Sequence, residues 1–289
     1  MSEFFHERYL YAKRTVDDRA IDRGVFDRLR EELGGGESLS AIEIGCGVGT
    51  GFTRFADWGL FPTGSAVEYV GVDRRPETVS RAREHVVGWA ERAGHAVDLD
   101  GDAIRVGTGD RSFSVRFVAD DARSVLADAT DVDVLIGQAI FDLLDLERAL
   151  SRCLSALRSG GLLYAPITFD GLTAFEPGHP LDEQVLTRYH ASMDDRAGHS
   201  ETGRRLLSAL PGSGAEVLAA AGSDWVVFPP YSADEAYFLV HLTEFVRREL
   251  VDGDLGEDVE RWVETRRSQI DREELVFLAH NLDLLARRP

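Results

Sequence analysis

The chain has 289 residues, a net charge of −19 and a hydrophobic content of 44%. These values fit a globular protein with one large α/β domain and additions, or with two small domains. No apolar run approaches the ~18 residues of a membrane span, and the N-terminus lacks the basic and apolar regions of a signal peptide. Composition therefore excludes a membrane partner and predicts a cytoplasmic protein.

The positive charge comes almost entirely from arginine, because Lys13 is the only lysine. Two explanations compete: an acidic surface that repels nucleic acid, and a halophilic surface adapted to high salt, which we favour. Neither explanation favours nucleic acid as a partner, since phosphate binding needs a basic footprint. The two cysteines, Cys46 and Cys153, make no disulfide framework, and no Cys/His cluster has zinc spacing, so no metal is expected.

Residues 3–33 predict two amphipathic helices. Their apolar side chains recur at three- and four-residue steps, and the glycines at 34–36 end the region.

Residues 41–51 predict a short buried strand, a glycine-rich turn and the start of a helix. Glycines occupy alternate positions from 45 to 51, where a backbone without side chains can approach a ligand closely. A strand that feeds such a turn is where open α/β sheets bind nucleotide-like ligands. The spacing is G-x-G-x-G, and Thr50 stands where the dinucleotide fingerprint needs a glycine.

Two acidic residues are associated with this turn. Glu43 lies two places before the first glycine, where a carboxylate would repel a pyrophosphate but suits a cationic amino group. A second strand over 68–72 ends in Asp73, and a carboxylate at that strand tip can accept both hydroxyl groups of a ribose. The ribose contact alone does not separate the possible cofactors.

The middle of the chain predicts helices at 74–93 and 143–157 and a β-hairpin at about 103–118. The hairpin is an extension, and the sequence leaves two roles open for it: an added sheet edge or a contact in a homodimer.

The last part of the chain predicts strands and helices around a loop rich in Gly and Pro at 170–180. Helices are expected at 181–196, 201–210, 233–250 and 258–272, and the last two make a helical insertion over about 232–272. Strands are expected at 164–169 and within 223–228. Residues 275–285 fit a final strand better than the alternative, a C-terminal helix.

At this point a resemblance is clear. Residues 43–49 with Asp73 resemble the first two motifs of the class I S-adenosylmethionine-dependent methyltransferases. Residues 115–122, 131–138 and 157–164 resemble the third motif, the fourth strand, and the double-glycine turn with the fifth strand, in the same order. The resemblance implies an α/β fold with a seven-stranded, mostly parallel, doubly wound sheet of the Rossmann-like kind. It also implies two parts: an N-terminal helical lid at 1–36 and a cofactor-binding domain at 37–289.

The resemblance assigns each part of S-adenosylmethionine a partner. The backbone of the glycine turn can hold the carboxylate near a helix N-terminus, and Glu43 can favour the ammonium. Asp73 suits the ribose. The turn residues concerned are Gly45, Cys46, Gly47 and Gly49, of which Cys46 is a small filler and no nucleophile.

The adenine is expected to meet the end of the third motif. Asp121 with the N–H of Ala122 fits its edge, Asp120 is the alternative in register, and Arg74 packs beside the ring. Either aspartate could instead only cap the next helix.

Gln138, at the tip of the fourth strand, is expected near the sulfonium, and Phe141 near adenine or acceptor unless it belongs to the core. His190 is the first candidate for a general base. Further pocket candidates are His179, Tyr189 and His199. On the N-terminal helices the lid candidates are Tyr11, Arg14 and Arg19, unless they are solvated surface charge.

These observations predict methyl transfer to a small-molecule acceptor, because residues 137–141 lack the Asn/Asp-Pro-Pro-aromatic sequence of amino-directed DNA methyltransferases. Two alternatives stay open: a non-catalytic S-adenosylmethionine-binding protein and, less favoured, a nicotinamide-dependent oxidoreductase.

Overall fold

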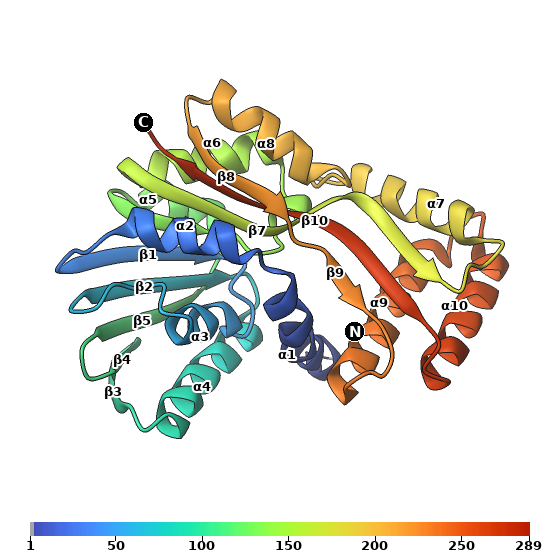
Figure 1. Ribbon diagram of the computed structural model, residues 1–289, viewed down its shortest axis with the longest axis horizontal. Coiled ribbons are helices and arrows are strands. Elements are labelled where there is room, and N and C mark those ends of the chain that lie inside the picture. Colours follow the sequence, from blue (N-terminus) through green and yellow to red (C-terminus); the bar gives the residue numbers. More distant parts are fainter. Residues whose placement is uncertain (1–2) are drawn as a thin grey trace.

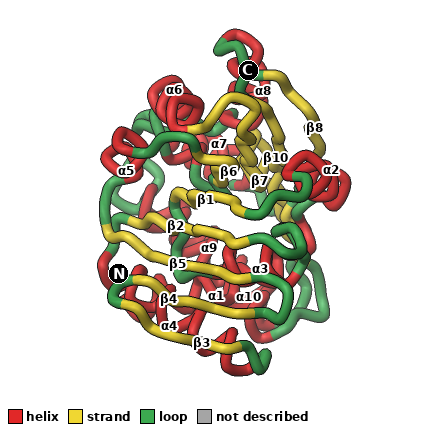
Figure 2. Tube along the Cα trace, turned by 90° about the vertical axis from the view of Figure 1, so that its left-hand side faces the viewer, coloured by secondary structure: helices red, strands yellow, loops and turns green. Residues whose placement is uncertain are grey.

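One mixed sheet runs through the molecule (Figure 1), and the computed structural model describes residues 3–289. Within that range the sheet has ten strands in the order β3-β4-β5-β2-β1-β6-β7-β10-β8, and β9 also pairs with β10. The strands are β1 (Ser38–Ile44), β2 (Ala66–Asp73), β3 (Ala96–Asp100), β4 (Ala103–Gly107), β5 (Ser112–Ala119), β6 (Val132–Ile136), β7 (Leu157–Glu176), β8 (Glu216–Gly222), β9 (Trp225–Val227) and β10 (Val276–Arg287). Figure 2 shows the strands of this sheet lying side by side, with β3 at one edge.

The expected seven-stranded, mostly parallel sheet is only partly right. Strands β5, β2, β1, β6 and β7 are parallel neighbours, as expected for a doubly wound fold. The pairings β3/β4, β4/β5, β7/β10, β8/β10 and β9/β10 are antiparallel. The sheet is therefore larger than predicted and mixed.

The hairpin expected at 103–118 is confirmed by β4 and β5, which pair from Ala103↔Arg116 to Gly107↔Ser112. A further strand, β3, pairs with β4 and was not predicted. Its side chains do not alternate between buried and exposed positions, and most of them are exposed. The hairpin therefore adds a sheet edge, which is one of the two roles that the sequence left open.

The largest difference from expectation concerns β7, which continues to Glu176 instead of ending at 169. The segment 170–176 is therefore strand and not loop. It continues because β10 pairs with it from Val276↔Glu176 to Arg287↔Leu162. The final segment is accordingly a strand, as expected, and not a helix.

The helices fall close to their expected places. They are α1 (Glu3–Ala20), α2 (Arg23–Leu33), α3 (Thr50–Asp57), α4 (Pro76–Arg92), α5 (Ala122–Asp128), the 3-10 turn η1 (Phe141–Leu143), α6 (Leu146–Ala156), α7 (Asp182–Asp194), α8 (Thr202–Gly212), α9 (Ala233–Leu250) and α10 (Gly256–Asp271). Helices α9 and α10 form the predicted insertion, and a capping box of Ser232 and Glu235 starts α9. Across residues 3–289, no helix is both long and apolar enough to cross a membrane.

Three hydrophobic clusters organise the described chain. The first packs α2, α3 and α4 on one face of the central strands, and the second packs α5, α6 and α8 on the other face. The third joins α1, α7, α9 and α10 to the far parts of β7 and β10. The carboxyl ends of the parallel strands lie next to α1, between the first two hydrophobic clusters and the third (Figure 1).

Candidate cofactor and acceptor site

The glycine turn between β1 and α3 has the backbone that the sequence predicted. Gly45, Gly47 and Gly49 have φ angles of 68°, 53° and 78°, in the left-handed region that favours glycine. A Cβ at Gly45 would lie 2.8 Å from the Ile140 side chain. A side chain at either end of the turn would therefore be strained, and the turn presents bare backbone.

Helix α1 covers this turn. A Cβ built at Gly47 would lie 3.4 Å from Leu10 Cδ1, and the Tyr11 ring faces the His85 ring of α4 at 5.3 Å. Arg14 pairs with Asp57 of α3 at 3.6 Å, whereas Arg19 pairs with Glu235 of α9. Helix α2 packs against the sheet within the first hydrophobic cluster, so in the described part of 1–36 it is α1 that lies over the turn.

Glu43 lies beneath the turn. It is 3% exposed, and the Tyr69 hydroxyl donates to its carboxylate. Its Oε1 would lie 2.1 Å from a Cβ at Gly51, so the side chain points under the start of α3. Burial raises the pKa of Glu43 to about 7 despite the Tyr69 hydrogen bond, so near neutral pH it is only partly charged. This placement is less suited to an ammonium than the sequence suggested.

Cys46 is a buried member of the same turn, as expected for a filler. Its N–H donates to the Val72 carbonyl at 3.0 Å, which ties the turn to the tip of β2. Burial raises the pKa of its thiol well above the ordinary value, so a thiolate nucleophile is disfavoured.

The tips of β2 and β5 lie side by side. The Asp120 N–H donates to the Asp73 carbonyl at 3.1 Å, and Asp73 Oδ1 accepts from the Arg75 N–H at 3.0 Å. Asp73 Oδ2 makes no hydrogen bond within the described chain, and Arg74 is exposed beside it. One carboxylate oxygen is thus free at the strand tip next to the glycine turn.

The two candidate aspartates for adenine differ. Asp121 caps α5 by accepting from the Arg123 N–H at 2.9 Å, and its other oxygen pairs with the Arg123 side chain at 2.7 Å. These bonds lower the pKa of Asp121 to about 2. Asp120 is exposed and accepts only from the Asp121 N–H, and Ala122 begins α5. The structure therefore favours the capping alternative for Asp121 and leaves Asp120 the freer carboxylate.

Gln138 lies at the β6 tip but is held on both ends. Its Oε1 accepts from Arg54 Nη1 at 2.6 Å, and its Nε2 donates to Asp17 Oδ2 at 2.8 Å. The next residue, Ala139, has a left-handed φ of 48°, and its N–H donates to the Pro166 carbonyl. Such strain in a non-glycine residue clusters at functional sites.

Phe141 occupies the position of a core residue. Its side chain is 0% exposed, and Cε2 would lie 2.5 Å from a Cβ at Gly137. It belongs to the second hydrophobic cluster, so the structure favours the core alternative over ligand contact.

His190 lies on α7, beside β7. Its Nε2 is 3.1 Å from Thr173 Oγ1, and its ring contacts Phe169 edge-on. Burial lowers the pKa of His190, which keeps the imidazole neutral and able to accept a proton. The neighbouring Tyr189 packs in the third hydrophobic cluster.

The other two histidine candidates serve local structure. His179 Nδ1 accepts from the Leu181 N–H at 3.2 Å, and His199 Nδ1 accepts from the Glu201 N–H at 3.0 Å. Both bonds close turns at helix starts, so the structure does not bring these two residues to the glycine turn.

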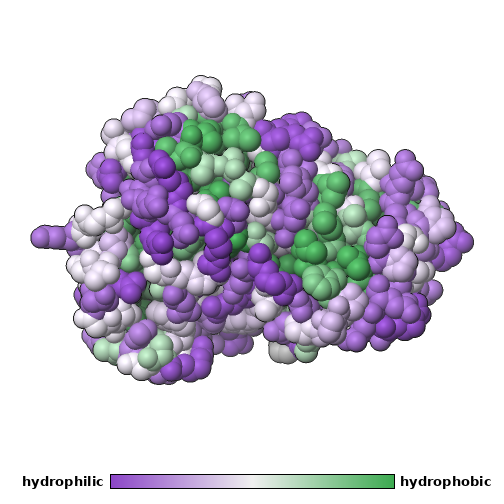
Figure 3. Space-filling model, in the orientation of Figure 1, coloured by the Kyte–Doolittle hydropathy of each residue, from purple (hydrophilic) through white to green (hydrophobic). Residues whose placement is uncertain are grey.

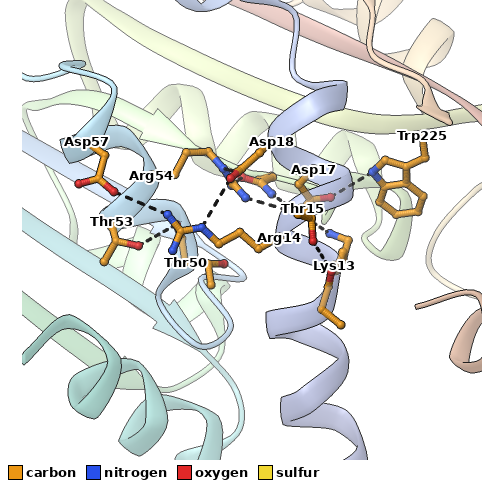
Figure 4. Close-up of polar contacts among 12 residues, drawn as sticks. Lys13, Arg14, Thr15, Asp17, Asp18, Thr50, Thr53, Arg54, Asp57 and Trp225 are labelled. Carbon is orange, nitrogen blue, oxygen red and sulfur yellow. Dashed lines mark hydrogen bonds and ion pairs between the residues drawn. The ribbon is translucent and has the colours of Figure 1, made fainter. Parts of the chain in front are cut away.

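Three charged residues near the turn were not predicted from the sequence: Asp17, Arg54 and Asp142. Figure 4 shows Asp17 and Arg54 pointing toward one another from α1 and α3. Asp142 follows the β6 tip, its Oδ1 is buried without a hydrogen-bond partner, and burial raises its pKa to about 6. The available signal was a charged residue inside an apolar pattern, as at Arg54 between Thr53 and Phe55.

Two surface hollows lie away from these residues. One of about 560 Å³ is lined by α6, α8 and the end of β10, and another of about 390 Å³ is lined by β2, β4 and β5. Neither of these two hollows includes the glycine turn. Across the described residues, no group of three or more His, Cys, Asp or Glu side chains could hold a metal ion.

The strand order around β1, with the glycine turn at its carboxyl end and an acid at the tip of β2, defines a class I methyltransferase fold. Residues 42–165 match the model of a family described as a methyltransferase domain. The matched stretch runs from β1 into β7 and includes the glycine turn and Asp73, so this part of the chain is similar to a methyltransferase domain.

Solved structures share this fold at low sequence identity. A proposed methyltransferase of Bacillus halodurans C-125 has 14% identity and a TM-score of 0.54 over 91% of this chain and 98% of its own. An S-adenosylmethionine-dependent methyltransferase of Thiobacillus denitrificans, in complex with S-adenosyl-L-homocysteine, has 16% identity and a TM-score of 0.52 over 100% and 99%. YjhP of E. coli has 16% identity and a TM-score of 0.51 over 97% and 99%. A search of curated proteins finds no match.

Proposed function

We propose that this protein transfers a methyl group from S-adenosylmethionine to a small-molecule acceptor. The observation that carries the proposal is the bare, left-handed backbone at Gly45, Gly47 and Gly49 beside the free carboxylate oxygen of Asp73. A closely approachable turn at a helix N-terminus suits an anionic group, and the acid suits a ribose diol.

The residues present fit the cofactor. The turn offers backbone N–H groups, Asp73 offers one unbonded oxygen, and Asp120 offers an exposed carboxylate for an amine on adenine. When bound, S-adenosylmethionine supplies an electrophilic methyl group on a positively charged sulfur. Helix α1 would keep water from the turn, since Leu10 lies against Gly47.

The acceptor side is proposed to lie beyond the β6 tip, toward α7. His190, with its neutral ring, and Asp142, with a buried unbonded oxygen, are groups there that can accept a proton. Such a base is needed only when the acceptor atom carries a proton and is weakly acidic. The packing of α1, α7 and α9 in the third hydrophobic cluster supports a small acceptor. The S-adenosyl-L-homocysteine bound to the Thiobacillus protein supports the choice of cofactor.

Calorimetry with S-adenosylmethionine, S-adenosylhomocysteine and NAD tests the cofactor. We expect the first two to bind and NAD not to bind; NAD binding in place of the others would favour an oxidoreductase. Methyl transfer from labelled cofactor into small molecules of a cell extract then separates an enzyme from a non-catalytic binding protein. Label that appears only in protein or nucleic acid would overturn the small-molecule assignment.

A further inference from the structure

Arg54 is a fully buried charge beside the glycine turn. It lies on α3 five residues after Gly49 and has 0% exposure. Its Nε donates to Asp18 of α1, and its Nη1 donates to Gln138 at the β6 tip. The guanidinium therefore lies among α3, α1 and the end of β6, the elements that surround the turn.

One nitrogen of this guanidinium has no hydrogen bond. Arg54 Nη2 is buried, and the carboxylate oxygen paired with it, Asp17 Oδ2, is 3.9 Å away. A buried charged donor without a partner is costly, and the planar fork of arginine matches a carboxylate. Arg54 can therefore take one more carboxylate oxygen without losing its bonds to Asp18 and Gln138.

Asp17 supplies the opposite charge at the same place. It is 3% exposed, its Oδ1 accepts from Trp225 Nε1 at 3.0 Å, and its Oδ2 accepts from Gln138 at 2.8 Å. The same Oδ2 also accepts from the Lys13 ammonium at 3.2 Å. This carboxylate thus already binds an ammonium, which Glu43, buried against Tyr69, is poorly placed to do.

We propose that Arg54 and Asp17 form a clamp for the two charged ends of an amino-acid group. In this clamp, Arg54 Nη2 binds the carboxylate and Asp17 binds the ammonium. The inference rests on the proposed function, in which S-adenosylmethionine carries that group. Because Asp17 belongs to α1 and Arg54 to α3, the bound amino-acid end would hold the covering helix against the glycine turn. The two residues would then set the preference for the complete cofactor over truncated nucleosides.

Calorimetry with three nucleosides separates the two contacts. S-adenosylmethionine has both charged groups, decarboxylated S-adenosylmethionine keeps the ammonium alone, and 5′-methylthioadenosine has neither. The variants are Arg54→Gln and the isosteric Asp17→Asn. Arg81→Gln is the matched control, because Arg81 of α4 also ties α1 to a neighbouring helix, through Glu7 at 3.1 Å, and pairs with neither Asp17 nor Asp18.

We expect Arg54→Gln to weaken the binding of S-adenosylmethionine at least tenfold. Its affinity for the decarboxylated nucleoside should stay within about twofold of the wild-type affinity. Asp17→Asn should weaken both of these about tenfold. Neither variant should change the affinity for 5′-methylthioadenosine, which also reports that the variant is folded. Arg81→Gln should leave the order of the three affinities unchanged.

Two other outcomes are decisive. If wild type binds S-adenosylmethionine but both variants keep its ratio to 5′-methylthioadenosine, the clamp is wrong and the proposed function stands. If wild type binds none of the three nucleosides, the proposed function and the clamp both fail. Should Arg54→Gln not fold, Asp17→Asn decides, since an unchanged preference there also rejects the clamp.

Discussion

The two halves of the sheet are covered in different ways. Around β1, β2, β5 and β6, helices pack on both faces, and the first two hydrophobic clusters lie on opposite sides. Where β7, β9 and β10 extend beyond this part, the third cluster covers one face only. Alternation along β10 turns Phe277 into that cluster and Val276 away from it.

The uncovered face of the second half is apolar. Figure 3 shows hydrophobic side chains gathered over this part of the molecule, in the same orientation as Figure 1. The residues turned outward there are Leu172, Val226, Phe228 and Val276, with exposed fractions of 48%, 38%, 61% and 38%. The first half is thus completed by its own helices, while the second half depends on a core that covers only one face of the sheet.

In the first half, the glycine turn should not tolerate substitution by a residue with a branched side chain. Gly47→Val is expected to abolish S-adenosylmethionine binding, because a branched side chain must adopt a φ of 53° and would fill the space below Leu10. Calorimetry measures the loss. Gly59→Val is the matched control, since Gly59 also has a positive φ, 71°, but a Cβ there meets nothing within 4 Å. A Gly47→Val protein with wild-type affinity would show that the turn does not contact the ligand.

The second half should be fragile in its core and tolerant on its open face. Trp262 is 0% exposed, donates to Asp182 Oδ1 at 2.7 Å and packs edge-on against Phe175. Trp262→Ala is expected to lower the free energy of unfolding by about 3–5 kcal/mol. Phe228→Ala, on the open face, should change it by no more than about 0.5 kcal/mol. Denaturant titrations compare them, and equal losses would mean that the open face is covered in solution.

Burial of the Glu43 carboxyl beneath the glycine turn should make the free energy of unfolding depend on pH. The folded-state pKa of Glu43, about 7, lies above its ordinary value of 4.5, so the folded protein binds the proton more tightly. The resulting stabilisation is complete below about pH 4.5 and is lost as the pH rises through about 7, a change of about 3 kcal/mol.

Glu43→Gln should remove this dependence while keeping an acceptor for Tyr69. Denaturant unfolding of both proteins at about pH 5 and about pH 8 should show the smaller decline in the variant. Asp142 and Asp283, whose pKa values are also raised to about 6, contribute equally to both proteins and cancel in the comparison. Parallel declines would mean that Glu43 stays charged when folded.

The two halves also differ in how far the sequence predicts them. The strand, turn and helix around Gly45–Gly49 follow from local spacing and chain conformation, and the hairpin at 103–118 follows from two short β-rich runs around a turn. The continuation of β7 through 170–176 depends on pairing with β10, about a hundred residues later, which no local pattern shows.

The candidate site shows the same division. Asp73 is identified by its place at a strand end, because the strand pattern fixes where its backbone lies. The role of Asp17 depends on how α1 packs over α3 and the β6 tip, since its partners Gln138 and Trp225 lie far along the chain. For Phe141 the sequence leaves ligand contact and core both open, because its place after β6 is local but its rotation into the core depends on the space at Gly137.

The smallest expected effect concerns the acid at the β2 tip. Asp73→Ala should weaken S-adenosylmethionine binding by about 1–3 kcal/mol, the scale of a lost hydrogen bond to a charged group. Asp121→Ala is the informative comparison, because its carboxylate is engaged by Arg123 and caps α5. It should lower thermal stability by about 1 kcal/mol while changing affinity less than Asp73→Ala does. If Asp121→Ala costs more affinity than Asp73→Ala, the adenine contact lies at Asp121, and its pairing with Arg123 must open when the cofactor binds.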